Sequence, residues 1–219
     1  MYTSYHDYIK YKHLRVKQHS ASDLFYAVTP ELQFFDKDNK RLNATEEQDL
    51  ELISILLEHG ADVNKLGKIA DLSLAIRGPV SVGHTATVKA LLDAGARIET
   101  RSETGSPALF EAIFNHTGDP KGYPDMVKLL LDYGANANIT YQHPGFGPLS
   151  ALAYACMELF GLGEVNGQIV QKTVKRPNKE IIELLLTYGA NPQDAKALDY
   201  AKQAEDASII QLLQNAASK

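Results

Sequence analysis

The sequence has a single cysteine, no long apolar run and no surplus of positive charge, and each shortage excludes a class of protein. Cys156 cannot form an internal disulfide, which fits a reducing compartment. The longest apolar run, Ala151 to Met157, has seven residues, whereas a membrane-spanning helix needs about 20. The first ten residues mix tyrosines with polar groups and lack the apolar stretch of a signal peptide. We therefore expect a cytoplasmic protein that does not cross a membrane.

The charge balance gives no electrostatic reason to bind nucleic acid. There are 22 Lys and Arg side chains against 27 Asp and Glu, so the net charge is -5. The 219 residues, with 44% hydrophobic and 22% charged side chains, have the composition of one ordinary globular domain or two small ones. We expect no nucleic-acid partner.

What the sequence does contain is a phrase that recurs four times. It has the form Leu-Leu-x-x-Gly-Ala and begins at Leu56, Leu91, Leu130 and Leu185. Apolar residues at helical spacing precede each copy, and glycine ends a helix well because it enters the left-handed conformation without steric penalty. A shorter phrase around a leucine precedes each copy and recurs once more near the C-terminus. These leucines are Leu24, Leu72, Leu109, Leu149 and Leu198.

In these phrases the chain resembles the ankyrin-repeat family, whose unit of about 33 residues is a β-turn followed by two antiparallel helices. The Gly-Ala step and the Thr-Pro-Leu-His-x-Ala frame are hallmarks of that family. The histidine position of the frame is filled by other residues here, so the hydrogen bonds that histidine supplies are absent or replaced. The substitutes are Phe25, Ser73, Phe110, Ser150 and Asp199.

The resemblance implies an all-α ankyrin-repeat solenoid of about five helix-turn-helix units. We expect an N-terminal cap or arm over residues 1-20 and a repeat domain over 21-217. Residues 1-20 form either a half-repeat that covers the first unit or a tyrosine-rich binding arm. The units are expected at about 21-64, 65-99, 100-138, 139-193 and 194-217, the last being a polar capping repeat.

Uneven spacing of the phrases indicates insertions between the two helices of a unit, chiefly in the first and fourth. The first insertion ends in Thr45-Glu-Glu-Gln48, a capping box that predicts a helix from Glu46. The second contains Asn166-Gly167 between apolar residues, which predicts a β-hairpin. Four basic residues follow that hairpin and form either a solvated face or a docking site for an acidic partner. They are Lys172, Lys175, Arg176 and Lys179.

No group of residues predicts catalysis or a cofactor. The histidines are scattered without a metal-binding pair, and Cys156 lies among apolar residues, as expected of a packed core thiol. The acidic run from Asp36 resembles a calcium loop, but Lys40 and Arg41 occupy its ligand and glycine positions. We predict no enzyme activity, no cofactor and no metal site.

The resemblance also implies where a partner protein docks, since ankyrin proteins usually bind through their turn tips and the concave row of short helices. The third turn is the strongest candidate because it carries two large rings on a loop rich in proline and glycine. The alternative is that Phe146 only covers the next helix. The candidate binding residues are Lys65, Lys68, Arg101, Glu103, Tyr141, Gln142, His143 and Phe146.

From this we expect a protein that is monomeric when free and that binds one partner protein in a one-to-one complex. The simplest action of such a chain is to inhibit or neutralise the partner by covering it, as an immunity protein does with a toxin enzyme. The alternative is an adaptor that bridges two proteins through opposite surfaces. An enzyme formed by the inserted loops is a third, weaker hypothesis.

Overall fold

The fold is described from a computed structural model, which covers residues 34–35, 41–42, 46–58, 60–64, 76, 79–80, 83–99, 106–114, 123–165 and 168–218. The predicted N-terminal cap, residues 1-20, lies outside these ranges. The chain divides into two compact units, residues 1–103 and 104–219, and each is described by itself.

The first unit contains two helices and a short strand pair. Strands β1 (Phe34–Phe35) and β2 (Arg41–Leu42) pair antiparallel. Helices α3 (Glu46–Glu58) and α5 (Thr85–Asp93) pack on each other, and α3 begins at the predicted residue. The Glu46 carboxylate accepts hydrogen bonds from the backbone N–H groups of Ala86 (2.6 Å) and Thr87 (3.3 Å). The start of α3 therefore also stabilises the start of α5, whose first N–H groups have no partner within the helix.

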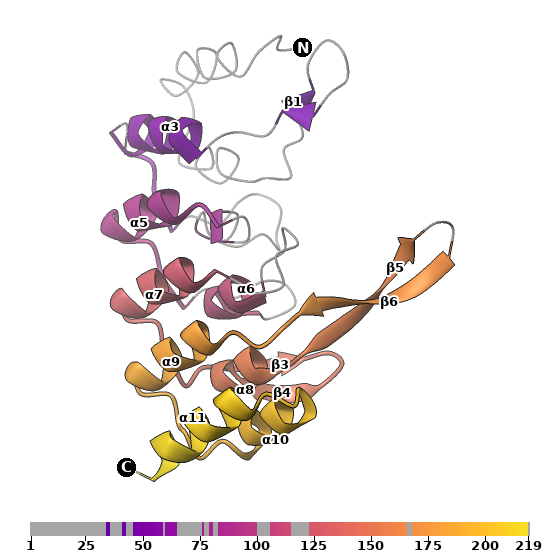
Figure 1. Cartoon of the computed structure of the whole chain (residues 1–219). Coiled ribbons are helices and arrows are strands. Elements are labelled where there is room, and N and C mark those ends of the chain that lie inside the picture. The colour runs from indigo at the N-terminus through magenta and orange to yellow at the C-terminus, as the bar shows by residue number, and fades with distance from the viewer. Residues whose placement is uncertain are drawn as a thin grey trace. The chain divides into compact units, whose positions relative to one another are not determined.

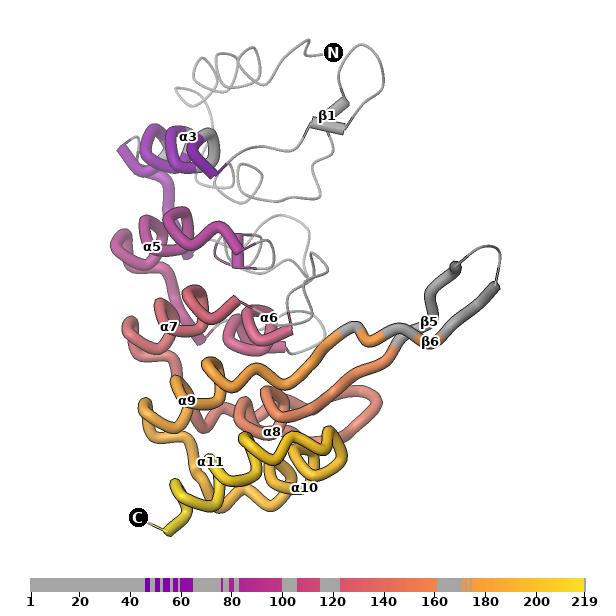
Figure 2. The backbone as a smooth tube through the Cα atoms, in the orientation of Figure 1, coloured from indigo at the N-terminus to yellow at the C-terminus, as the bar shows by residue number. Residues whose placement is uncertain are grey.

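The second unit is built from helices in two layers. One layer holds α6 (Ala108–Phe114), α8 (Ala151–Cys156) and α10 (Ala195–Gln203). The other holds α7 (Pro124–Asp132), α9 (Lys179–Thr187) and α11 (Ala207–Ala217). Neighbouring helices contact each other within each layer, and α6–α7, α8–α9 and α10–α11 are in contact across the layers (Figures 1 and 2).

Apolar residues at helical spacing form the core between these layers. Each helix of the α7 layer buries one stripe, whereas all six residues of α8 are buried. Four residues of α8 are alanine or cysteine, and such small side chains let the neighbouring helices approach closely. The core residues of α7 and α9 are Met126, Val127, Leu130, Leu131, Ile181, Ile182 and Leu185.

The repeat glycines end the helices as predicted. Gly134 has φ +91°, and Gly189 has φ +87°. After α7, the N–H of Gly134 donates to Leu131 O (3.0 Å) and that of Ala135 to Leu130 O (2.9 Å). This pair of bonds is the Schellman motif, which satisfies carbonyls left free at a helix end.

An asparagine three residues after the Gly-Ala step connects consecutive repeats. In the second unit, Asn138 Nδ2 donates to Gly189 O (2.7 Å) and Asn138 Oδ1 accepts from Asn191 N (2.8 Å). In the first unit, Asn64 makes the same pair of bonds to Gly95 O and Arg97 N, both at 2.8 Å. The side chain thus uses both a donor and an acceptor on the backbone of the next turn.

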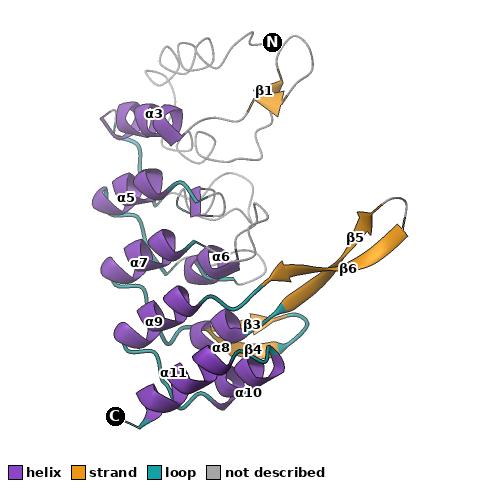
Figure 3. Cartoon of the chain, viewed as in Figure 1, coloured by secondary structure: helices purple, strands orange, loops and turns teal. Residues whose placement is uncertain are grey.

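Strands interrupt the helical layers at two places in the second unit (Figure 3). Strands β3 (Thr140–His143) and β4 (Gly147–Ser150) pair antiparallel, as do β5 (Leu159–Val165) and β6 (Gln168–Lys175). Residues 166 and 167, the predicted hairpin turn, lie outside the described ranges. The expectation of an all-α chain with one hairpin omitted the β1–β2 and β3–β4 pairs, because short strands at turns lack a long alternating pattern.

Candidate functional site

The third turn of the repeat array is a tight β-hairpin between β3 and β4. The N–H of Phe146 donates to His143 O (3.3 Å), which closes a four-residue turn. Pro144 follows His143 and fixes the backbone at the position where such turns favour proline. Gly147 takes φ +70° directly after the turn, a conformation that strains other residues. The sequence Pro-Gly-Phe-Gly therefore sets the direction in which the Phe146 ring points.

The two strands place alternate side chains on opposite faces. Tyr141 pairs with Leu149, and both side chains are buried. Gln142 pairs with Pro148, and both are exposed. One face of the hairpin therefore covers the core of the second unit, and the other faces solvent.

A row of rings connects this hairpin to the core. Phe110 of α6 stacks on Tyr154 of α8 with 5.0 Å between centroids and meets the edge of Tyr141 at 5.4 Å. The His143 ring lies 5.6 Å from Tyr141 and 4.8 Å from Phe146. Phe146, at the end of the row, is 44% exposed. Its ring thus lies on a surface that buried aromatic residues support.

Burial corrects the expectation that Tyr141 and Phe146 are both exposed anchors. Tyr141 is only 7% exposed because its strand position turns the ring toward Phe110. Gln142 remains exposed and His143 is partly buried. Of the predicted third-turn residues, Gln142, His143 and Phe146 can therefore reach a partner directly, and Tyr141 supports them from below.

Burial favours the uncharged form of His143. Desolvation by burial lowers the pKa of its imidazole from 6.5. Its Nδ1 accepts a hydrogen bond from Gly145 N at 3.1 Å, so the ring proton of the neutral form is on Nε2. The candidate surface is therefore aromatic and neutral at this point.

Polar contacts hold β4 to the neighbouring helices. Ser150 Oγ accepts from Ala153 N (2.9 Å) at the start of α8 and donates to the Asp194 carboxylate. Asp194 in turn accepts from Lys196 N (2.9 Å) at the start of α10. The Lys196 ammonium donates to Pro148 O (2.7 Å). These contacts tie β4 to the starts of α8 and α10, which reduces the flexibility that has to be lost on binding.

Sequence reasoning missed the burial of Lys175. The interpretation of a basic solvated face is wrong at this residue, because Lys175 is 1% exposed. Leu159 pairs with Lys175 but Phe160 pairs with Thr173, so Val174 is an extra residue that interrupts the alternation. Such a bulge redirects the side chains that follow it, and no sequence pattern predicts it. Phe160, also not predicted, is 53% exposed.

Two other residues of the predicted basic face lie beside carboxylates. Arg176 Nε is 3.8 Å from Glu158 Oε1, and Lys179 Nζ is 3.7 Å from Glu183 Oε1. Exposed pairs at such distances contribute little to stability. The two carboxylates nevertheless reduce the positive charge that would attract an acidic partner.

Cys156 is a buried core thiol, as predicted. Burial raises its pKa to about 12, so the nucleophilic thiolate is scarce at neutral pH. Within the described ranges, no group of three or more His, Cys, Asp or Glu side chains is placed to hold a metal ion. No described helix has the length and apolar character needed to cross a membrane.

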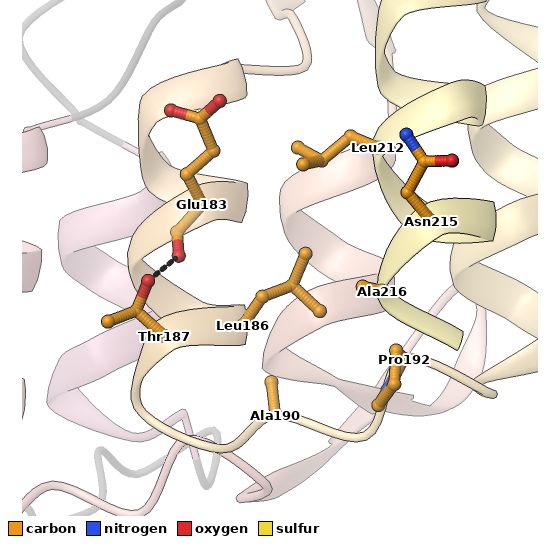
Figure 4. A pocket seen from close by; sticks show the side chains of 8 residues that line it. All are labelled: Glu183, Leu186, Thr187, Ala190, Pro192, Leu212, Asn215 and Ala216. Atoms are coloured by element: carbon orange, nitrogen blue, oxygen red, sulfur yellow. Dashed lines mark hydrogen bonds between the residues drawn. The ribbon is translucent and has the colours of Figure 1, made fainter. Parts of the chain in front are cut away.

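A shallow apolar hollow lies between α9 and α11 (Figure 4). Its volume is about 360 Å³. The hydroxyl of Thr187 donates to the backbone carbonyl of Glu183 (2.7 Å), which keeps that polar group within the helix. The lining residues are Glu183, Leu186, Thr187, Ala190, Pro192, Leu212, Asn215 and Ala216. The sequence does not predict this hollow, because the two helices lie in separate repeats.

The candidate residues of the first two turns lie outside the described ranges. The structure therefore places neither Lys65 and Lys68 nor Arg101 and Glu103, and their role in binding stays a prediction.

Comparison with known proteins agrees with the helix pairs. The family model "Ankyrin repeats (3 copies)" matches residues 42–142. Over these residues the chain is similar to ankyrin-repeat proteins. Ankyrin repeats are generally non-catalytic and bind other proteins, so the match indicates a protein-interaction module.

Two curated relatives of this chain are similar over the same length. Ankyrin repeat and SOCS box protein 6 of Homo sapiens is 28% identical over 149 residues, which are 67% of this chain and 34% of the relative. The protein of the same name from Pongo abelii is 27% identical over the same shares. The chain thus matches about a third of the length of these relatives.

Proposed function

We propose that this chain is an ankyrin-repeat protein that binds one partner protein and inhibits or neutralises it by covering its active face. The surface that we propose for this contact is the tip of the β3–β4 hairpin, where the exposed Phe146 lies against the His143 ring. We further propose a cytoplasmic chain of five repeat units that is monomeric when free and binds its partner one-to-one. A toxin enzyme, neutralised by the chain as its immunity protein, is the specific target class we propose.

The observation that carries this proposal is that Phe146 is exposed while buried aromatic side chains lie beneath it. A phenylalanine ring that is 44% exposed lies over His143, and buried rings lie beneath them. Aromatic side chains on rigid supports supply much of the binding energy at protein interfaces. The exposed polar residue Gln142 provides a rim of the kind that surrounds such anchors.

The chemistry of this surface supports the proposal of occlusion. His143 is neutral and partly buried, and Cys156 is a buried thiol with a raised pKa, so the hairpin and its support are suited to contact and not to turnover. A rigid surface that binds without reacting acts most simply by blocking access to what it covers.

The alternative function is that of an adaptor that bridges two proteins. It is favoured by the presence of a second surface feature, the hollow between α9 and α11, on helices other than those that carry the β3–β4 hairpin. The names of the relatives also join ankyrin repeats with a SOCS box. An adaptor would use the two surfaces for two different proteins.

Affinity capture with three versions of the chain tests the proposal. Immobilised wild type, Phe146→Ala and the control Tyr133→Ala are exposed to the same cell extract, and retained proteins are identified by mass spectrometry. Tyr133 is also an exposed aromatic residue, but it lies at the end of α7. We expect one protein to be retained by wild type and Tyr133→Ala and lost with Phe146→Ala.

The activity of the captured protein then separates the two functions. An inhibited enzyme loses its activity at one equivalent of the chain, and its expression without the chain harms the cell. An adaptor instead retains two proteins at once, and variants in the α9–α11 hollow release only one of them. Equal retention by all three versions would remove the β3–β4 hairpin from consideration.

A further inference from the structure

A buried lysine connects the base of the β5–β6 hairpin to helix α8. Lys175 is the last residue of β6 and pairs with Leu159, the first residue of β5. Its side chain is 1% exposed and extends to the end of α8. Lys175 is therefore the point at which the hairpin base and the helix share a polar contact.

The atoms that bind the lysine are neutral acceptors. The Lys175 Nζ donates to Met157 O at 2.7 Å and to Ala155 O at 3.3 Å. It also lies 5.3 Å from the centroid of the Tyr154 ring, whose face attracts a cation. Carbonyls at a helix C-terminus favour a positive charge, but they do not neutralise it as a carboxylate does.

The charged and titratable groups around Lys175 come from several elements. Cys156 and Tyr154 of α8 adjoin it, and burial raises the pKa of both groups. Glu158 favours the charged lysine, but its carboxylate also lies 3.8 Å from Arg176. Glu111 of α6 further raises the pKa of Tyr154, and Asp194, the residue before α10, further raises that of Cys156. The lysine thus lies in an environment whose nearest polar atoms are carbonyls.

We propose that the Lys175 contact is a proton-dependent switch, in which the uncharged side chain keeps the hairpin base closed on α8 and protonation favours release of the base into solvent. The switch goes beyond the proposed partner binding and does not depend on it. Burial without a neutralising partner makes the charged lysine costly only while the base is closed. Release lets water surround the ammonium and removes that cost.

The direction of the pH dependence follows from proton linkage. Desolvation lowers the pKa of Lys175 in the closed form to about 7, whereas an exposed lysine titrates at 10.5. The open form therefore binds the proton more tightly, and falling pH favours opening between these two values. From pH 9 to pH 6 the opening constant is expected to rise on the order of a hundredfold.

Cys156 provides a reporter for this opening because it is the only cysteine and is buried next to the contact. The rate of its alkylation by iodoacetamide is measured from pH 6 to pH 9. Each rate is divided by that of the urea-unfolded chain at the same pH, which removes the ionisation of the thiol itself. We expect the normalised rate of the wild type to rise on the order of a hundredfold from pH 9 to pH 6.

Lys175→Met is the matched control, since methionine has a similar length and carries no charge. Its normalised rate is expected to stay constant over the same pH range. Equal pH dependence in wild type and Lys175→Met would overturn the proposal. The proposal would also be overturned if α7 lost as much amide protection as the hairpin base does. Opening would then be global unfolding and not release of the hairpin base.

A second measurement needs no variant and decides the matter even if Lys175→Met fails to fold. The side-chain nitrogen of Lys175 is titrated by NMR in the folded wild-type chain with ¹⁵N-labelled lysine. Titration of this nitrogen near pH 7 supports the switch. Titration near 10.5, the ordinary value of a lysine side chain, would contradict it.

Discussion

At the scale of single residues, Tyr141 and Phe146 lie on one hairpin but have opposite environments. Tyr141 packs on Phe110 inside the second unit, whereas Phe146 leaves 44% of its surface in solvent. Replacing the first removes core packing, and replacing the second removes a surface ring. The two substitutions therefore separate stability from binding.

Phe146→Ala is expected to weaken partner binding by about 2 kcal/mol while leaving the melting temperature nearly unchanged. The reason is that Phe146 would contribute an exposed ring to the proposed interface and contributes little to the core. Calorimetric titration and thermal unfolding of the same sample measure both quantities. A large drop in melting temperature would mean that Phe146 is structural, as in the alternative where it only covers a helix.

Tyr141→Ala is expected to lower the free energy of unfolding by about 3 kcal/mol, the usual cost of removing a buried aromatic ring. Urea unfolding followed by circular dichroism provides the measurement. Tyr141→Phe is the control, since it keeps the ring between Phe110 and His143. Equal stability of Tyr141→Ala and wild type would contradict the burial of this residue.

Asn138 tests the contact between consecutive phrases. Asn138→Ala removes a donor to Gly189 O and an acceptor from Asn191 N, and net losses of about 1 kcal/mol per hydrogen bond predict a cost of about 2 kcal/mol. Asn138→Asp keeps the acceptor but places a carboxylate against a carbonyl, so it should be no better than alanine. Chemical unfolding that ranks aspartate equal to wild type would refute the donor role.

At the scale of secondary-structure elements, the repeat glycines determine where the helices end. Gly134→Ala is expected to lower the free energy of unfolding by about 1 kcal/mol, because the left-handed conformation at φ +91° is unfavourable for alanine. A steric clash is not the cause, since no atom lies within 4 Å of the added Cβ. Gly145→Ala is the control, since an added Cβ there makes only ordinary contacts at 3.8 Å with the His143 ring. Thermal unfolding should therefore separate the two variants.

The start of α11 gives a pH-dependent prediction. The Asp206 carboxylate accepts from Ser208 Oγ (2.7 Å) and Ser208 N (3.0 Å), and chiefly the hydroxyl bond lowers its pKa below 3.8. Because the folded pKa is below the unfolded one, this stabilisation is present above about pH 4 and is lost as the pH falls through the folded value. Asp206→Ala should cost about 1 kcal/mol at pH 7.

The same variant supplies its own control at low pH. Once the carboxylate is protonated, wild type and Asp206→Ala should differ in stability less than they do at pH 7, as measured by urea unfolding at both values. A difference that does not shrink on acidification would show that the charge of Asp206 is not what stabilises the start of α11.

The sequence predicted the helix ends well but not the direction of certain side chains. The Gly-Ala steps predicted the ends of α7 and α9 because only the local conformation at Gly134 and Gly189 matters there. The burial of Tyr141 and Lys175 depends on a strand register and on the extra residue in β6, and both arise from pairing between separate segments. The local sequence pattern of one segment does not predict how it pairs with another.

At the scale of the whole molecule, stacked helix pairs support the β3–β4 hairpin, the surface that we propose binds another protein. The repeats bury their apolar stripes against neighbours, and polar bonds from Asp194 and Lys196 hold the β3–β4 hairpin in place. None of these contacts has to form on binding. The cost of ordering is therefore small, and we expect most of the contact energy of Phe146 to contribute to affinity.

The most direct measurement is a calorimetric titration of the captured partner into wild type and Phe146→Ala. The account predicts one partner per chain and a dissociation constant about 30-fold larger for the variant, the equivalent of about 2 kcal/mol. Unchanged affinity in a folded Phe146→Ala chain, or a stoichiometry other than one, would contradict it.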